Sequence, residues 1–145
     1  MMVLRQADTE VGYQPMSLTD VAIGLRAADD TYAAQWVLIS EFLEELRDED
    51  SESRAALIAP EPPTVDGAKW DVFLGALAEY VAIRSNISVP AWSVRPHRVW
   101  CGAVWFLSSL QSVRACALAT SPASFRARGI FLEEQDLLRD GMALR

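Results

Sequence analysis

The stretch YAAQWVLISEFLEEL, residues 32–46, decides the fold class of this chain. Its large apolar side chains recur at intervals of three and four residues, which places them on one face of an α-helix. They are Tyr32, Trp36, Ile39, Phe42, Leu43 and Leu46. Most of the acidic residues of the stretch fall on the opposite face. The pattern predicts a helix of about four turns with one side in a core.

Helical signals continue on both sides of this stretch. Upstream, Ser17 is followed three residues later by Asp20, a pair that can cap the first turn of a helix. Downstream, Asp66 is expected to cap a helix that Asn86 closes, and Ser121 is expected to cap a shorter one. Further helices are predicted over residues 54–59, 98–108, 110–120 and 133–138.

The predicted fold class is all-α, with about six helices in one compact domain. The short apolar run Ile130–Leu132 is the exception, and it is predicted to form a short extended edge. Strand and helix signals do not alternate along the chain, which argues against an α/β nucleotide-binding domain.

Prolines at positions 60, 62 and 63 mark the main internal boundary, because proline interrupts a regular helix. We expect an arm at residues 1–16, an acidic helical part at 17–59, a proline-rich link at 60–66 and an aromatic, arginine-bearing helical part at 67–145. Up to position 66 there are 14 acidic and 4 basic residues, a net charge of −10, and after it 6 acidic and 9 basic residues, a net charge of +3. Neither part alone would bury a large core, so we expect a single domain.

Composition excludes several classes of protein. The chain has 145 residues, of which 51% are hydrophobic, and only two cysteines. That apolar content argues against disorder, and two cysteines are too few for a disulfide scaffold. The first residues lack the apolar run of a signal peptide and no stretch reaches the length of a membrane span, so we expect a cytoplasmic location and no membrane partner. A net charge of −7 disfavours direct binding to nucleic acid.

The side chains that catalysis usually needs are scarce. His97 is the one histidine, and the sequence contains neither a phosphate-binding glycine motif nor a metalloprotease motif. His97 and Cys101 are four residues apart and would share one face of a helix, which keeps open an enzyme with a Cys–His pair. Cys101 also lies within an apolar run, where cysteine behaves as a small hydrophobic residue. We favour the second interpretation and expect no catalytic residue, no metal and no cofactor.

Aromatic and arginine side chains gather in two segments, residues 92–105 and 121–131. Trp and Arg dominate the energetics of protein interfaces, so these segments are candidates for a partner-binding surface. The predicted partner-binding residues are Trp92, Arg95, His97, Arg98, Trp100, Phe125, Arg126, Arg128 and Phe131. The alternative is a core loop and a tight turn, with indole rings packed inside and arginines in solvent. Trp36, Trp70 and Trp105 are expected in the core.

Several stretches taken together resemble a known family. The most specific are Val-Pro-Ala-Trp at residues 89–92 and Phe-Arg-Ala-Arg-Gly-Ile-Phe at residues 125–131. Shorter pieces of the same series lie at residues 16–22, 36–43, 62–64, 70–71, 74–80 and 114–118. From Ser17 to Leu138 the chain is similar to the helical C-terminal domain of bacterial Xre-type, helix-turn-helix antitoxin-like proteins of type II toxin–antitoxin operons. We expect no counterpart of the helix-turn-helix, since about sixteen residues precede Ser17.

The resemblance implies the part of an antitoxin that holds a partner, without the part that reads an operator. The expected function is a non-catalytic protein that binds a cognate toxin and neutralises it by steric occlusion. The expected toxin is of the nucleotidyltransferase, kinase or RNase type, and the acidic half of the chain would complement a basic toxin surface. Two alternatives stay open. One is a DNA-binding transcriptional regulator that uses Arg114, Arg126 and Arg128, and the other is an immunity or scaffold protein with no toxin partner.

Overall fold

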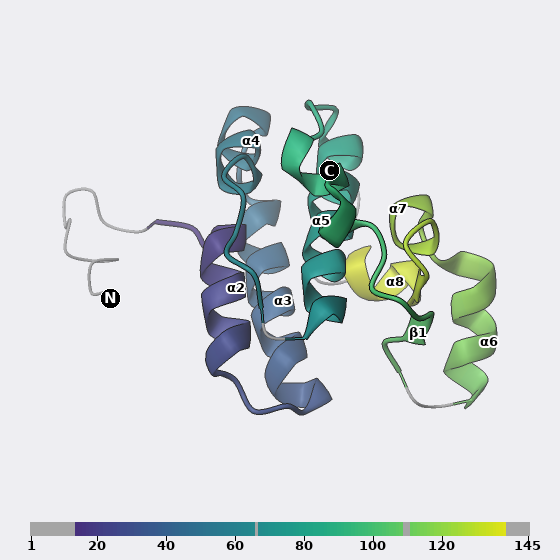
Figure 1. The fold of residues 1–145 in the computed structure, drawn as a ribbon. Coiled ribbons are helices and arrows are strands. Elements are labelled where there is room, and N and C mark those ends of the chain that lie inside the picture. The colour runs from purple at the N-terminus through teal and green to yellow at the C-terminus, as the bar shows by residue number, and fades with distance from the viewer. Residues whose placement is uncertain (1–13, 66, 109–110, 139–145) are drawn as a thin grey trace.

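The computed structural model describes residues 14–65, 67–108 and 111–138. Within these ranges the chain forms seven α-helices, two short 3-10 helices and two strands of two residues each, which confirms the predicted all-α class (Figure 1). The elements are α2 (Leu18–Ala27), α3 (Tyr32–Arg47), α4 (Ser51–Ile58), α5 (Ala68–Ser85), η1 (Ala91–Val94), η2 (Pro96–Arg98), β1 (Trp105–Phe106), α6 (Gln111–Thr120), α7 (Ala123–Arg126), β2 (Ile130–Phe131) and α8 (Glu134–Leu137). In the described residues no helix combines the length and the apolar content needed to cross a membrane.

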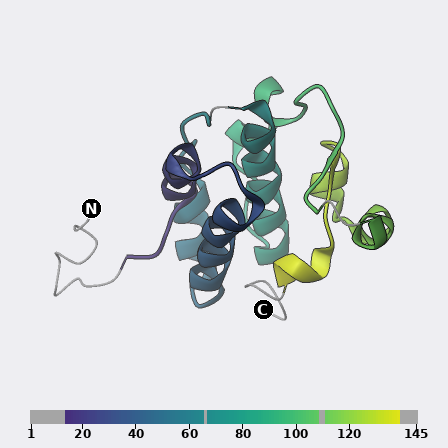
Figure 2. The same ribbon diagram turned by 90° about the horizontal axis from the view of Figure 1, so that it is seen from below.

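Helix α5 is the centre of the fold. It lies between the α2–α3 pair on one side and α6 to α8 on the other (Figure 1; Figure 2). It contacts α2, α4, α7, η1 and η2, and most of its residues are buried, including Asp71 and Gly75. A helix that is apolar on nearly all sides belongs inside a domain, where other elements cover it from several directions. Buried side chains from both halves of the chain form one continuous cluster around it.

The N-terminal helices follow the signals in the sequence. Helix α2 begins with the predicted cap, because the Asp20 amide donates to Ser17 Oγ at 3.2 Å and the Ser17 amide donates to Asp20 Oδ2 at 3.0 Å. Helix α4 begins earlier than predicted, at Ser51, because Asp50 accepts a hydrogen bond from the Ser53 amide at 2.8 Å. That hydrogen bond also holds the pKa of Asp50 below its ordinary value.

The ends of α5 agree with the prediction at one terminus. Asn86 adopts the left-handed conformation, with φ at +58°, and closes the helix as predicted. Its amide donates to the carbonyl oxygens of the last turn. The predicted cap at the other end, Asp66, lies outside the described residues, and Gly67 stands at the N-cap position with no side-chain cap.

The predicted helix over residues 98–108 is wrong. The 3-10 turn η2 ends at the first residue of this range, and the chain continues through Gly102, at φ +97°, to the strand β1. Strand β1 pairs in parallel with β2, and the Trp105 amide donates to the Gly129 oxygen at 2.9 Å. Backbone groups here find their partners across two strands instead of along a helix. Strand β2 confirms the extended edge predicted at residues 130–132.

Ser121 does not cap a helix as predicted. Pro122 occupies the N-cap position of α7, with no side-chain cap. The buried Ser121 hydroxyl lies 2.7 Å from the Ala117 oxygen and 2.9 Å from the Leu132 oxygen, and it accepts a hydrogen bond from the Leu132 amide at 2.9 Å. The hydroxyl therefore ties the end of α6 to the chain just after β2, where backbone groups need partners.

An aromatic cluster joins α5 to the C-terminal elements. Phe73 packs against Trp105 and Phe125, with ring centroids 6.1 and 5.2 Å apart, and Trp70 meets Trp105 at 5.7 Å. Trp70 is buried, while Trp105 and Trp36 are half-buried and pack against the same core. The three tryptophans that were expected in the core therefore contact it.

Candidate functional site

The predicted partner-binding residues divide by exposure. The buried ones are Trp92, Arg98, Phe125 and Arg128, the half-buried one is Phe131, and the exposed ones are Arg95, His97, Trp100 and Arg126. Partner contact stays a prediction for all of them. Among the buried residues, Arg98, Phe125 and Arg128 expose almost no side-chain surface, whereas Trp92 lines the groove described below. Phe131 stacks on Phe106 of the neighbouring strand, with ring centroids 5.2 Å apart.

Arg98 is completely buried, with an exposed fraction of 0%. Its guanidinium donates to the Pro62 oxygen at 2.7 Å and to the Asp71 oxygen at 3.3 Å, and it lies over the Trp92 ring at 5.0 Å. Trp92 in turn donates its indole N–H to the Ile58 oxygen at 3.0 Å. Arg98 therefore connects η2 to the proline-rich link and to α5, and Trp92 connects η1 to the end of α4. A buried charge also needs an opposite charge. Arg98 finds two, Glu61 of the proline-rich link at 3.3 Å and Asp71 Oδ1 of α5 at 3.8 Å.

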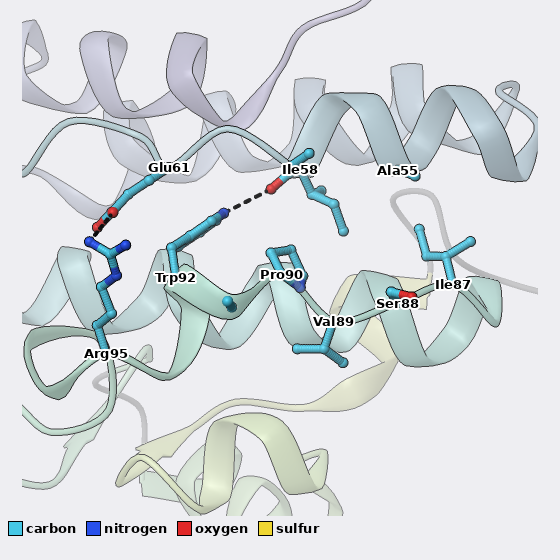
Figure 3. Close-up of a pocket in the computed structure, with 11 residues that line it drawn as sticks. Ala55, Ile58, Glu61, Ile87, Ser88, Val89, Pro90, Trp92 and Arg95 are labelled. Atoms are coloured by element: carbon cyan, nitrogen blue, oxygen red, sulfur yellow. Dashed lines mark hydrogen bonds and ion pairs between the residues drawn. The ribbon is translucent and has the colours of Figure 1, made fainter.

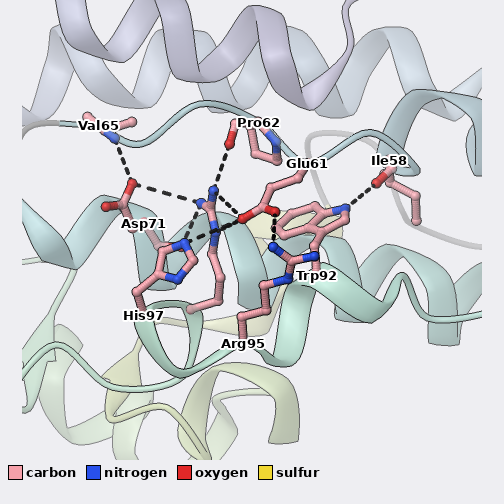
Figure 4. A network of polar contacts seen from close by, with 9 residues as sticks. Ile58, Glu61, Pro62, Val65, Asp71, Trp92, Arg95 and His97 are labelled. Carbon is pink, nitrogen blue, oxygen red and sulfur yellow. Dashed lines mark hydrogen bonds and ion pairs between the residues drawn. The ribbon is translucent and has the colours of Figure 1, made fainter.

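Glu61 is the centre of a polar network that no sequence pattern revealed (Figure 4). Its Oε1 lies 3.0 Å from Arg95 Nη1, and its Oε2 lies 3.3 Å from Arg98 Nη2 and 3.4 Å from His97 Nε2. One carboxylate therefore faces three basic side chains from the η1–η2 segment. One sequence signal was available, because Glu61 is a single acidic residue flanked by prolines, which hold the backbone extended.

Arg128 fastens the η1–η2 segment to the C-terminal turn. It donates to the oxygens of Arg98 and Ser93, each at 2.9 Å, and pairs with Glu79 of α5 at 2.6 Å. The same two oxygens press against Gly75 of α5, where a Cβ would lie 2.8 Å from the Arg98 oxygen and 3.0 Å from the Ser93 oxygen. Because Gly75 has no side chain, the two carbonyl groups can lie close to α5. The buried guanidinium of Arg128 donates hydrogen bonds to both of them.

The arginines of the DNA-binding alternative are engaged within the chain. Arg126 donates to two backbone oxygens near the end of α6, at 2.8 and 2.9 Å. Arg114 lies over the Phe106 ring at 5.0 Å, and Arg128 is buried. To reach base edges, Arg126 and Arg128 would first have to release acceptors inside the protein. No described contact favours this alternative.

The Cys–His pair of the enzyme alternative does not share a helix. His97 lies in η2 and faces Glu61, whereas Cys101 follows η2, and its thiol lies 3.4 Å from the Ala103 oxygen. Helical spacing was the reason to expect these side chains together, and the helical turn ends between them. In the part of the chain that the structure describes, no group of three or more His, Cys, Asp and Glu side chains is placed to hold a metal ion.

Trp100 is the large aromatic side chain that this region exposes, with an exposed fraction of 51%. Its ring lies on Gly129, where a Cβ would be 2.7 Å from Trp100 Cζ3. Gly129 has a φ of +79°, a conformation that favours glycine. Val104 is also exposed, and its Cα lies 3.6 Å from the same position. The indole of Trp100 is therefore exposed on one side and packs against the backbone of Gly129 on the other.

An open groove of about 720 Å³ runs between α4 and residues 87–92 (Figure 3). Apolar side chains and small residues form most of its lining, which consists of Ala55, Ile58, Ala59, Glu61, Ile87, Ser88, Val89, Pro90, Ala91, Trp92 and Arg95. The Glu61–Arg95 ion pair stands at one end, and Ile87 and Ser88 lie at the other.

Comparisons of the chain with protein-family models, curated proteins and solved structures gave no match. Function is therefore inferred from the surface just described, which combines an exposed and supported tryptophan with an apolar groove that ends at an ion pair.

Proposed function

We propose that this chain is a non-catalytic, antitoxin-like protein that binds a cognate toxin in the bacterial cytoplasm and neutralises it by steric occlusion. The observation that carries the proposal is Trp100, an indole that is half-exposed and yet held against Gly129. A large exposed aromatic surface gains free energy when a partner covers it, and interface hot spots are enriched in Trp.

The support beneath Trp100 favours a binding role. A side chain that is already ordered loses little conformational entropy when a partner covers it. Val104, with an exposed fraction of 55%, extends the apolar surface next to the ring. The centres of protein interfaces are enriched in aromatic and other apolar side chains, as Trp100 and Val104 are here.

Neutralisation by coverage needs no chemistry from this chain. An interface of about 800 Å² per partner is of standard size and can cover an active site. Toxins of the nucleotidyltransferase, kinase and RNase types act on anionic substrates, so their active surfaces are positive. The net charge of −7 complements such a surface and speeds the encounter.

Bacterial growth tests the proposal. The product of the gene adjacent to this one is expressed alone and together with this chain. We expect the product alone to stop growth and the wild-type chain to restore it. Failure of the wild-type chain to restore growth, or a harmless adjacent product, would contradict the antitoxin function.

The role of Trp100 is tested in the same assay. Trp100→Ala is expected to restore little growth, because it removes the proposed anchor. Leu118→Ala is the matched control, since Leu118 is also 51% exposed but lies on α6. Full restoration by Trp100→Ala would show that the anchor lies elsewhere.

A further inference from the structure

The groove between α4 and residues 87–92 has a charged end that is built from the inside of the protein outward. Completely buried Arg98 holds Glu61 through its Nε, at 3.4 Å, and its Nη2, at 3.3 Å. Glu61 then holds Arg95 Nη1 at 3.0 Å. The outermost member of this series is Arg95, whose side chain is 60% exposed. A surface arginine is rarely fixed in this way, because its long side chain usually keeps its rotamer freedom.

The fixed guanidinium has donors to spare. Only Nη1 of Arg95 is engaged by Glu61, and within the described residues its Nε and Nη2 have no acceptor. The Glu61 carboxylate is already shared among Arg95, His97 and Arg98. It therefore does not occupy the remaining N–H groups of Arg95. Arginine prefers a carboxylate that it can contact with two parallel N–H groups. The free edge of Arg95 therefore fits a carboxylate from outside the chain.

The rest of the groove fits apolar side chains. On the α4 side the groove is shallow, because Ala55 and the C-cap residue Ala59 have only methyl side chains. Trp92 and Pro90 form its middle, and the hydrogen bond from Trp92 to the Ile58 oxygen holds the indole in place (Figure 3). Val89 is partly exposed, at 39%. A volume of about 720 Å³ is in the range of sites that take several side chains of a peptide.

We propose that this groove binds a segment of a partner protein in which apolar residues lie next to an aspartate or glutamate. The apolar side chains lie between α4 and residues 87–92, and the carboxylate bonds to Arg95. The inference rests on the proposed function in that the chain is a protein-binding module, and it adds the chemistry of the segment that is recognised. It assigns Glu61 and Arg98 as positioning residues for Arg95.

The probe is a phage-displayed library of random dodecapeptides, selected on the full chain. We expect the selected peptides to share apolar residues next to an acidic one. Ala59→Trp fills the groove and should weaken their binding by about tenfold or more. Ala56→Trp is the matched control, because Ala56 is an exposed residue of α4 that does not line the groove. Peptides that bind both variants equally would overturn the proposal, as would the absence of selected peptides.

The contact with Arg95 is tested by a double-mutant cycle. Arg95→Gln in the protein and aspartate-to-asparagine, or glutamate-to-glutamine, in the selected peptide should each weaken binding about tenfold, and the two changes together should cost no more than either alone. Additive losses would overturn the pairing. Arg47→Glu, a charge change outside the groove, should leave peptide affinity unchanged. Because the probe is a peptide, failure here is distinguishable from failure of the toxin assay, which reads growth.

Discussion

The two halves of the molecule are held together in different ways. Helices α2 to α5 are mostly long, and they meet through completely buried apolar side chains such as Phe42 and Leu43. The described residues between 87 and 138 form 3-10 turns, two-residue strands, the four-residue helices α7 and α8, and the longer helix α6. Their connections to α5 combine the aromatic packing of Phe125 with the guanidinium groups of Arg98 and Arg128, which donate to backbone oxygens. In the first half, buried Arg54 serves two backbone oxygens at the end of α3 in the same way.

The difference follows from how the backbone N–H and C=O groups of each half find hydrogen-bond partners. A long helix pairs most of its own N–H and C=O groups, so apolar packing can hold it in place. Short turns leave carbonyls without partners, and a buried carbonyl needs a donor. One arginine offers five N–H donors at the end of a long side chain, so two arginines can serve several carbonyls. The two halves should therefore respond to different substitutions.

Arg128→Met tests this difference with the largest expected effect. The change keeps a flexible apolar stem, but it leaves the oxygens of Ser93, Arg98 and Ser124 without their donor and Glu79 without its partner. We expect the free energy of unfolding to fall by about 3–5 kcal/mol, because a buried polar network loses its central member. Urea unfolding followed by circular dichroism measures the change.

Arg126→Met is the control for that experiment. Arg126 lies two positions away and also donates to two backbone oxygens, but its side chain is exposed, so water can replace it. We expect a loss of about 1 kcal/mol or less. Equal losses for the two variants would mean that burial of Arg128 does not matter.

Arg98→Lys sharpens the comparison within a single turn. Lysine keeps the charge but loses the planar donors that reach Pro62, Asp71 and Glu61 at the same time. We expect a loss of about 2–3 kcal/mol in unfolding free energy. Arg95→Lys, three positions earlier on the surface, should change stability by about 0.5 kcal/mol or less. A stable Arg98→Lys variant would contradict the role of Arg98 as the donor that joins these segments.

Gly75→Ala and Gly24→Ala form the next pair, since both glycines lie inside helices. A Cβ at Gly75 would meet the Arg98 oxygen at 2.8 Å, which is backbone fixed by Arg128, so we expect a loss of about 1–3 kcal/mol. A Cβ at Gly24 would meet only the end of the Leu38 side chain, at 2.9 Å. That side chain can move, and the gain in helix propensity offsets the contact. The measurement is thermal unfolding. Equal losses of stability in the two variants would refute the distinction.

Tyr80, at the junction between α5 and α8, gives the smallest effect near neutral pH and a larger one only in alkali. Burial, followed by the charge of Glu134, raises the pKa of Tyr80 well above its ordinary value, and its hydroxyl donates to Glu134 Oε2 at 3.1 Å. The folded state therefore holds this proton more tightly than the unfolded chain does. The resulting stability is fully present below about pH 10 and is lost as the pH rises from there, by at most about 1.4 kcal/mol per pH unit. Urea unfolding at several alkaline pH values should show a shallower decline for Tyr80→Phe, and identical declines would exclude this cause.

The helices could be predicted where their signals are local. The apolar spacing of residues 32–46 and the capping pair at Ser17 and Asp20 lie within single elements. The structure agrees with both, except that Tyr32, at the start of the apolar face, is 50% exposed. The expected helix over residues 98–108 was wrong because its backbone pairs with β2, which lies far along the chain. A local pattern carries no information about such a partner.

The candidate site was predicted by residue type but not by exposure. Arg95 and Arg98 stand three residues apart, yet their side chains are 60% and 0% exposed. Arg95 precedes the turn with extended backbone, whereas Arg98 belongs to it, so the two side chains leave in different directions. Glu61 and Gly75 were missed because their roles depend on oxygens and guanidinium groups from distant segments.

Calorimetric titration of the adjacent gene's product with this chain tests most directly whether exposed residues bind a partner while buried ones hold the fold. We predict that Trp100→Ala raises the Kd at least about tenfold, as expected for an interface anchor, while its unfolding free energy stays close to that of the wild type. Leu118→Ala should bind as the wild type does. An unchanged Kd for Trp100→Ala would contradict the account.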